Sequence, residues 1–146
     1  MANKPIAVGS DHAGYRLKEA VKRYLKKLNL PIKDYGPENE DRVDYPEYGV
    51  RVGRAVVSKK SDRGIIMCGS GIGISIAANK VKGVRAALCH NVNTAYLSRA
   101  HNDANILALG GRLISERLAR TIVKKFLETP FEGGRHTRRV RMINKI

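Results

Sequence analysis

The feature that most constrains this fold is the regular alternation of short apolar runs with stretches of helical periodicity. Apolar runs suited to buried strands lie at residues 6–8, 31–35, 64–67, 84–88 and 105–109. After each one, apolar residues recur at helical spacing, at 17–28, 48–56, 72–81, 91–100 and 115–128. Strands that alternate with helices predict βαβ units, a parallel sheet and helices on both of its faces. We therefore expect an α/β, Rossmann-like three-layer sandwich with a five-stranded parallel sheet and an extra C-terminal helix.

The length and composition predict a single domain that spans residues 1–146. An apolar fraction of 42% over 146 residues is enough for a packed core, and no linker or repeat divides the chain. No apolar run approaches the length of a membrane-spanning helix. Residues 1–5 lead directly into the first apolar run, without a signal-peptide pattern. Cys68 and Cys89 make no disulfide framework, so we expect a cytoplasmic enzyme or binding protein.

The charge allows two interpretations. With 28 Lys+Arg against 13 Asp+Glu the formal charge is +15, which suits a nucleic-acid-binding module or a protein that handles phosphorylated small molecules. Nucleic-acid binders often place aromatic side chains among basic ones for base stacking. Here aromatic residues make up only 5%, and none follows Phe131 in the basic C-terminal segment. The composition therefore favours the small-molecule interpretation and leaves nucleic acid as the alternative.

The loop after the third apolar run is the strongest candidate for a site. In parallel sheets, ligands bind at the carboxyl ends of strands. This loop reads Cys68-Gly69-Ser70-Gly71-Ile72-Gly73 and opens a helix. Glycines let the backbone approach a ligand, and a helix N-terminus attracts anions. The same positive end favours the thiolate of Cys68, which predicts a base or nucleophile beside an anion cradle. The alternative is a buried cysteine next to a tight turn.

Four familiar motifs do not fit this loop. Ile74 stands where a dinucleotide-binding fingerprint needs its third glycine, and no Gly-Lys-Ser/Thr follows as in a P-loop. The same Ile74 replaces the arginine of a Cys-x5-Arg phosphatase loop. A Gly-x-Ser-x-Gly elbow would need glycine at the position of Cys68.

Other polar residues lie near the predicted strand ends. Asp11 and His12 follow the first strand and can contact sugar hydroxyls and a phosphate; alternatively Asp11 caps the first helix. Arg112 follows the fifth strand, where it also lies on the predicted ligand-binding edge.

Two further groups stand outside these loops. His101, beside Asn102, is a candidate acid or base, with a purely structural histidine as the alternative. Arg135 and Arg139 are four residues apart, so a helix would place them on one face, where they can clamp a phosphate. The alternative is a solvated basic tail. The four histidines are scattered and there is no Cys-x-x-Cys, so we predict no metal site.

Five sequence blocks together resemble the type B ribose-5-phosphate isomerases and the related allose- and galactose-6-phosphate isomerases. They are Ser10-Asp11-His12-Ala13-Gly14, Asp44-Tyr45-Pro46, residues 68–80, residues 99–105 and Gly133-Gly134-Arg135-His136. The blocks are distributed along nearly the whole chain, from residue 10 to residue 136, in the family's order.

The resemblance implies an aldose–ketose isomerase that works through an enediolate without a metal or cofactor. Cys68 matches the base that moves a proton between C1 and C2 of the sugar, and His101 matches the residue that assists ring opening. Ser70 stands where the family usually has threonine, and it keeps the hydroxyl that helps to hold the oxyanion. Some members replace the cysteine by a carboxylate from the next helix, but residues 74–81 contain no Asp or Glu.

The resemblance also implies the substrate contacts and the assembly. Sugar contacts fall on Asp11, Tyr45 and Asn102; phosphate contacts fall on His12, Arg112, Arg135 and Arg139; and the anion hole falls on the backbone of Gly69, Gly71, Ile72 and Gly73. Members are homodimers or dimers of dimers whose sites combine two subunits, so the C-terminal arginines would act across the interface. The implied reaction interconverts ribose 5-phosphate and ribulose 5-phosphate in the pentose phosphate pathway, with allose or galactose 6-phosphate as the alternative substrate.

Overall fold

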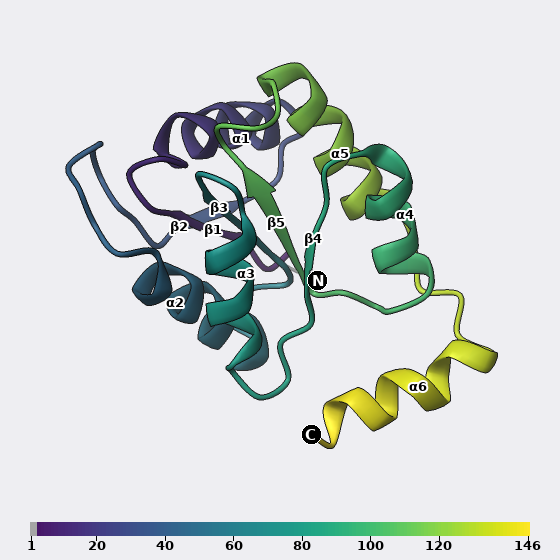
Figure 1. Cartoon of the computed structure of the whole chain (residues 1–146). Helices are drawn as coiled ribbons and strands as arrows, with labels where there is room; N and C mark the ends of the chain where they lie inside the picture. Colours follow the sequence, from purple (N-terminus) through teal and green to yellow (C-terminus); the bar gives the residue numbers. More distant parts are fainter. Residues whose placement is uncertain (1–2) are drawn as a thin grey trace.

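The computed structural model describes residues 3–146, in which strands and helices alternate as the sequence predicts (Figure 1). Met1 and Ala2, which belong to the predicted domain and to the segment searched for a signal peptide, lie outside the described residues. The elements are β1 (Ile6–Ser10), α1 (Tyr15–Lys27), β2 (Ile32–Asp34), α2 (Tyr45–Val57), β3 (Gly64–Cys68), α3 (Ile72–Asn79), β4 (Ala86–Leu88), α4 (Val92–Ala100), β5 (Ile106–Gly110), α5 (Glu116–Glu128) and α6 (Arg135–Asn144).

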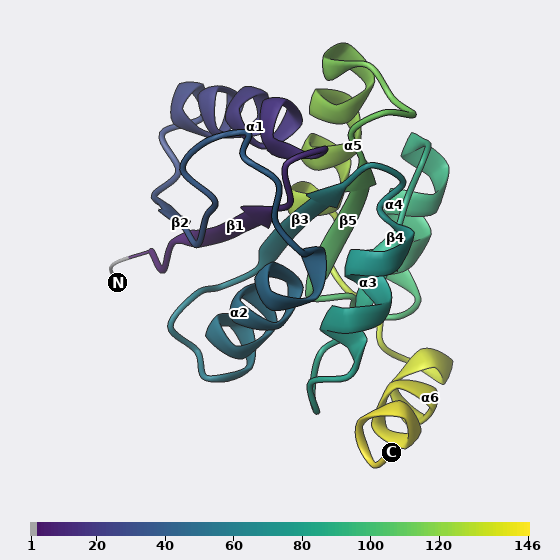
Figure 2. The ribbon, with the colours of Figure 1, turned by 60° about the vertical axis from the view of Figure 1, so that its left-hand side comes forward.

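All five strands are parallel, in the order β2-β1-β3-β5-β4, which confirms the predicted fold class. The three inner strands are buried along their whole length, and their side chains alternate between two cores. Val8, Met67 and Leu109 pack beneath α1, α4 and α5, whereas Ala7, Ile66 and Ala108 pack against α2 and α3. Figures 1 and 2 show these helices on opposite faces of the sheet.

The two edge strands are shorter than the sequence pattern suggests. Apolar residues indicate strands at 31–35 and 84–88, but only Ile32–Asp34 and Ala86–Leu88 pair. Each of these strands has a neighbour on one side only, and its side chains are partly exposed. Apolar content alone does not show where such an edge strand stops pairing.

A buried charge pair ties α1 to β2. The ammonium of Lys18, whose side chain is fully buried, donates to Asp34 at 2.9 Å and to the carbonyl of Pro37 at 2.6 Å. Lys22 donates to the second oxygen of the same carboxylate at 2.8 Å. Burial alone would raise the pKa of Asp34, but these hydrogen bonds hold it below its ordinary value. The pair anchors the start of the loop that leads to α2.

Helix α6 lies outside the three layers and is mostly exposed (Figure 1). Among residues 3–146, no helix combines the length and the apolar character that crossing a membrane requires.

Candidate active site

A pocket of about 790 Å³ opens at the carboxyl ends of β1, β3 and β5. It is lined by the loops that follow these strands and by the N-terminal ends of α2 and α3. Nine of the predicted site residues line it: Asp11, His12, Tyr45, Cys68, Gly69, Ser70, Ile72, Gly73 and Arg112. Gly71, which is also predicted, lies in the same loop as Cys68.

Backbone hydrogen bonds hold the three loops together. The amide of Asp11 donates to the carbonyl of Met67 at 3.1 Å, and the amide of Gly111 donates to the carbonyl of Cys68 at 2.8 Å. The amide of Arg112 then donates to the carbonyl of Gly69 at 3.0 Å. The parallel sheet therefore fixes the residues of three separate loops relative to one another.

Cys68 ends β3 and is 4% exposed. The amide N–H of Gly71 donates to its Sγ at 3.1 Å. The sulfur therefore lies beside a backbone N–H donor at the N-terminal end of α3. The geometry suits the role of a base that the sequence predicts.

Only a narrow choice of residues fits the start of α3. Gly71 has φ +78°, and a Cβ on it would lie 2.8 Å from the carbonyl carbon of Leu109, so a glycine is required. A Cβ on Gly73 would lie 2.5 Å from Cζ of Tyr45. The absence of a side chain at Gly73 thus allows the phenol of Tyr45 to rest against α3 at the pocket.

Some of the amide donors expected in the anion cradle are already engaged. Gly71 donates to the sulfur, and Ile72 donates to Oγ of Ser70 at 3.1 Å. The amide of Ser75 reaches the carbonyl of Gly71 at 3.2 Å. In the first turn of α3, the amides of Gly73 and Ile74 are the ones without an acceptor in the described part of the chain.

Asp11 and His12 combine a structural role with a place at the pocket. Asp11 is 5% exposed, and its Oδ1 accepts the N–H of Gly14 at 2.9 Å, immediately before α1. This contact fits the capping alternative, although Asp11 also lines the pocket. Nδ1 of His12 lies 3.3 Å from the amide nitrogen and 3.2 Å from the carbonyl oxygen of Val43, so the tautomer decides which bond forms.

The pocket also contains Arg42, which the sequence reasoning did not single out. It is exposed in the loop before α2 and adds a positive charge to a pocket that already contains Arg112. Its position two residues before the Asp44-Tyr45-Pro46 block is the signal that could have identified it.

Four predicted residues lie away from this pocket. His101 and Asn102 occupy the turn between α4 and β5. They therefore lie at the amino ends of the strands, whereas the pocket lies at the carboxyl ends. Asn102 lines a separate cavity of about 270 Å³ beside β4. Arg135 and Arg139 are both exposed on α6, one helical turn apart as predicted. One copy of the chain therefore does not bring the whole predicted set together.

His101 forms a separate cluster with His136 and Glu132. The rings of His101 and His136 stack with centroids 4.2 Å apart, and Nε2 of His101 lies 3.7 Å from a carboxylate oxygen of Glu132. Partial burial lowers the pKa of His136, and electrostatic interactions with the neighbouring His101, Arg135 and Arg139 act in the same direction. Ligand atoms of His101, Glu132 and His136 lie within 4.8 Å of one another. Nearly parallel rings do not direct their nitrogens at one shared ion, so the arrangement does not favour a metal.

Known proteins resemble this chain over almost its full length. The sequence profile of the family described as Ribose/Galactose Isomerase matches residues 6–143. Ribose-5-phosphate isomerase B of Escherichia coli is 45% identical over 143 residues, which is 98% of this chain and 96% of that protein. A crystal structure of a ribose 5-phosphate isomerase from Thermotoga maritima superposes with a TM-score of 0.96 at 50% identity and covers 99% of this chain and 100% of that one. A ribose-5-phosphate isomerase B from Clostridium thermocellum gives 0.95 at 51% identity, over 97% and 95% of the two chains.

Proposed function

This chain belongs to the ribose/galactose isomerase family and is a sugar phosphate isomerase, and from this premise we propose that it interconverts ribose 5-phosphate and ribulose 5-phosphate. The observation that carries the proposal is the position of Cys68: its sulfur accepts the N–H of Gly71 at 3.1 Å, at the N-terminus of a helix and in the wall of a pocket. The names of the relatives support a pentose phosphate as substrate, and the reaction would serve the pentose phosphate pathway.

The proposed reaction moves one proton between adjacent carbons. The thiolate of Cys68 takes the proton from C2 of the open-chain aldose, and the electrons of that C–H bond form the C1–C2 double bond of an enediolate. The charge that develops on the C1 oxygen meets the hydroxyl of Ser70 and the unpaired amides at the start of α3. The same proton then returns to C1, while the proton of the C2 hydroxyl passes to the neighbouring C1 oxygen, so that C1 carries a hydroxyl and the C2 oxygen becomes the carbonyl oxygen of the ketose. One proton thus moves between the two carbons through Cys68 and one between the two oxygens of the enediolate.

Cys68 is the base that this site offers. Two carboxylates line the pocket with it, but Oδ1 of Asp11 is already engaged by Gly14, and Asp44 is exposed at the start of α2. Helix α3 contains no Asp or Glu. Cysteine is one of the side chains that can serve as a general base when it is positioned at the reacting carbon.

We propose further that the complete site combines two copies of the chain in a homodimer. His101 would assist ring opening and Asn102 would contact the sugar, both from the second copy. Arg135 and Arg139 of that copy would bind the phosphate. His101 and Asn102 lie at the amino end of β5, Arg135 and Arg139 lie on α6, and none of the four lines the Cys68 pocket of its own chain, which supports this division.

Turnover on a panel of sugar phosphates tests the proposal. Purified wild-type protein is incubated with ribose 5-phosphate, allose 6-phosphate or galactose 6-phosphate, and the ketose is followed by NMR. We expect the largest kcat/KM on ribose 5-phosphate. A larger kcat/KM on either hexose phosphate would assign the alternative substrate, and no turnover on any of the three would overturn the proposed activity.

A further inference from the structure

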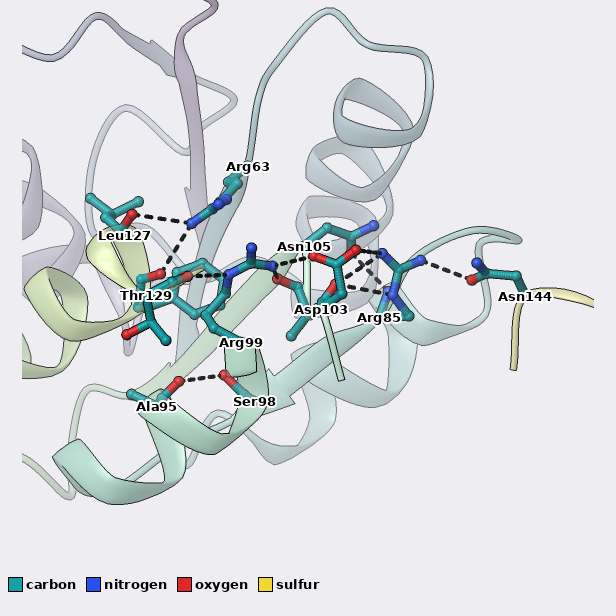
Figure 3. A network of polar contacts seen from close by, with 12 residues as sticks. Arg63, Arg85, Ala95, Ser98, Arg99, Asp103, Asn105, Leu127, Thr129 and Asn144 are labelled. Carbon is teal, nitrogen blue, oxygen red and sulfur yellow. Dashed lines mark hydrogen bonds and ion pairs between the residues drawn. The ribbon is translucent and has the colours of Figure 1, made fainter. Parts of the chain in front are cut away.

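Two arginines, Arg85 and Arg99, surround Asp103 (Figure 3). Asp103 directly follows His101 and Asn102 in the turn between α4 and β5. Arg99, in the last turn of α4, has a side chain only 5% exposed. Its Nη1 donates to the carboxylate of Asp103 at 2.8 Å and to the carbonyl of Ala104 at 2.6 Å. Its Nε donates to the carbonyl of Thr129 at 3.2 Å. One side of the turn is thereby fixed to α4 and to the segment after α5.

Arg85 holds the other side of the same turn. It lies directly before β4, and its Nε and Nη2 donate to the backbone carbonyl of Asp103 at 3.1 and 2.9 Å. Its Nη2 is also 3.5 Å from the Asp103 carboxylate. Asp103 has φ +47°, a left-handed conformation that is uncommon for non-glycine residues, although aspartate adopts it more readily than most. The hydrogen bonds from the two arginines hold Asp103 in this conformation.

Arg85 also reaches helix α6. Its Nη1 donates to Oδ1 of Asn144, the last residue of α6, at 2.8 Å (Figure 3). Within residues 3–146, this is the one hydrogen bond that joins the segment 133–146 to the rest of the chain. At the other end of α6, His136 stacks on His101. These two contacts hold opposite ends of α6, and Arg139 and the buried Val140 lie between them.

We propose that Arg85 is a positioning residue that sets the location of α6, and thus of Arg135 and Arg139, relative to the His101–Asn102 turn. This inference rests on the proposed function, in which the turn and the two arginines contact one sugar phosphate. The planar guanidinium can reach Asp103 and Asn144 together because its donors point in fixed, divergent directions. A lysine ammonium at this position has no such fork and cannot reproduce both contacts with the same geometry.

The role of Arg85 predicts an effect on phosphate binding. A displaced α6 moves Arg135 and Arg139 and so weakens their binding of the substrate's phosphate group. Cys68 and the start of α3 stay unchanged. Loss of the link should therefore raise KM and weaken binding of inorganic phosphate, while kcat changes less. A purely structural role would lower the melting temperature without this division between KM and kcat.

The variants Asn144→Ala, Arg85→Lys and their combination test the proposal. The matched control is Asn93→Ala, which removes the same side chain from an exposed position on α4. For each protein, kcat and KM on ribose 5-phosphate, the affinity for inorganic phosphate by calorimetry and the melting temperature are measured. We expect Asn144→Ala to raise KM and weaken phosphate binding by about three- to tenfold, the usual effect of one hydrogen bond. The double variant should go little beyond Arg85→Lys, because both changes break the same link.

Unchanged KM and phosphate affinity in Asn144→Ala, or effects equal to those of Asn93→Ala, would overturn the role of Arg85. Absence of turnover in the wild type would instead overturn the proposed function. Calorimetry with inorganic phosphate reports on α6 in either case, so the two failures remain distinguishable.

Discussion

At the scale of single residues, Ser70 links the fold of the loop to its chemistry. Its hydroxyl accepts the N–H of Ile72, which leaves the hydroxyl proton available to an oxyanion in the pocket. We expect Ser70→Ala to lower kcat by about 10²-fold, as the loss of one oxyanion donor typically does. Ser70→Thr keeps the hydroxyl and should retain most of the activity. Steady-state kinetics compare both with Ser58→Ala, which removes a hydroxyl at the far end of α2. Equal kcat in Ser70→Ala and Ser58→Ala would contradict this role.

Two glycines of the same loop should respond differently to alanine. Gly71→Ala places a side chain at positive φ against the backbone of Leu109, and it should lower the free energy of unfolding by at least about 1–2 kcal/mol. In Gly73→Ala the new methyl meets the ring of Tyr45, which is 39% exposed and can move away. We expect this variant to keep its stability in urea denaturation but to lose kcat/KM. A loss of stability as large as that of Gly71→Ala would show that Tyr45 is not free to move.

At the scale of secondary-structure elements, the contact between α1 and β2 predicts a dependence of stability on pH. The hydrogen bonds from Lys18 and Lys22 hold the pKa of Asp34 below its unfolded value of about 3.8. The stability that Asp34 contributes is therefore present above about pH 4 and is lost as the pH falls through the lower, folded pKa. Asp34→Asn should be less stable at neutral pH, because it leaves the buried ammonium of Lys18 without its counter-charge.

Denaturation curves between about pH 7 and pH 2 test this expectation. The free energy of unfolding of Asp34→Asn should fall less steeply below about pH 4 than that of the wild type. Asp41→Asn, a change at an exposed loop position, should follow the wild type. If the free energy of unfolding falls equally steeply below about pH 4 in Asp34→Asn and in the wild type, Asp34 is not the source of this pH dependence.

The elements themselves were largely predictable from the sequence. Continuous apolar runs identified β1, β3 and β5 because these strands are buried on both faces of the sheet. The ends of β2 and β4 were not predictable, because pairing at a sheet edge depends on one neighbour rather than on apolar content. Helix α6 was expected from its basic, periodic sequence, but its attachment through Arg85 and Asn144 joins residues far apart in the chain, which no local pattern indicates.

At the scale of the whole molecule, the site was predictable only in part. Loops at the carboxyl ends of parallel strands meet by topology, so Asp11, Cys68 and Arg112 could be placed together from the sequence. His101 precedes β5 and therefore lies at the amino ends of the strands, opposite the pocket at their carboxyl ends. Its expected role follows from the family resemblance, and in the proposed homodimer a second copy of the chain supplies it.

The charge of +15 predicts a dependence of catalysis on salt. The positive electrostatic field of the protein attracts an anionic sugar phosphate. Salt screens this field, because the Debye length shortens from about 30 Å at 0.01 M to about 3 Å at 1 M. We expect kcat/KM on ribose 5-phosphate to fall over this range while kcat changes little, as stopped-flow or steady-state kinetics can measure. A flat kcat/KM, together with tight duplex DNA binding that weakens steeply with salt, would favour the nucleic-acid interpretation instead.

The central claim is that Cys68 is the base, and its substitution tests that claim most directly. Interconversion of ribose 5-phosphate and ribulose 5-phosphate is measured for wild type, Cys68→Ala and the matched variant Cys89→Ala, which removes the other buried cysteine. We expect Cys68→Ala to lose about 10²–10⁴-fold in kcat, the usual contribution of a positioned base, with its fold intact by circular dichroism. Cys89→Ala should stay close to wild type. A Cys68→Ala variant that turns over ribose 5-phosphate within about tenfold of the wild type would contradict the account, because a positioned base contributes more than that.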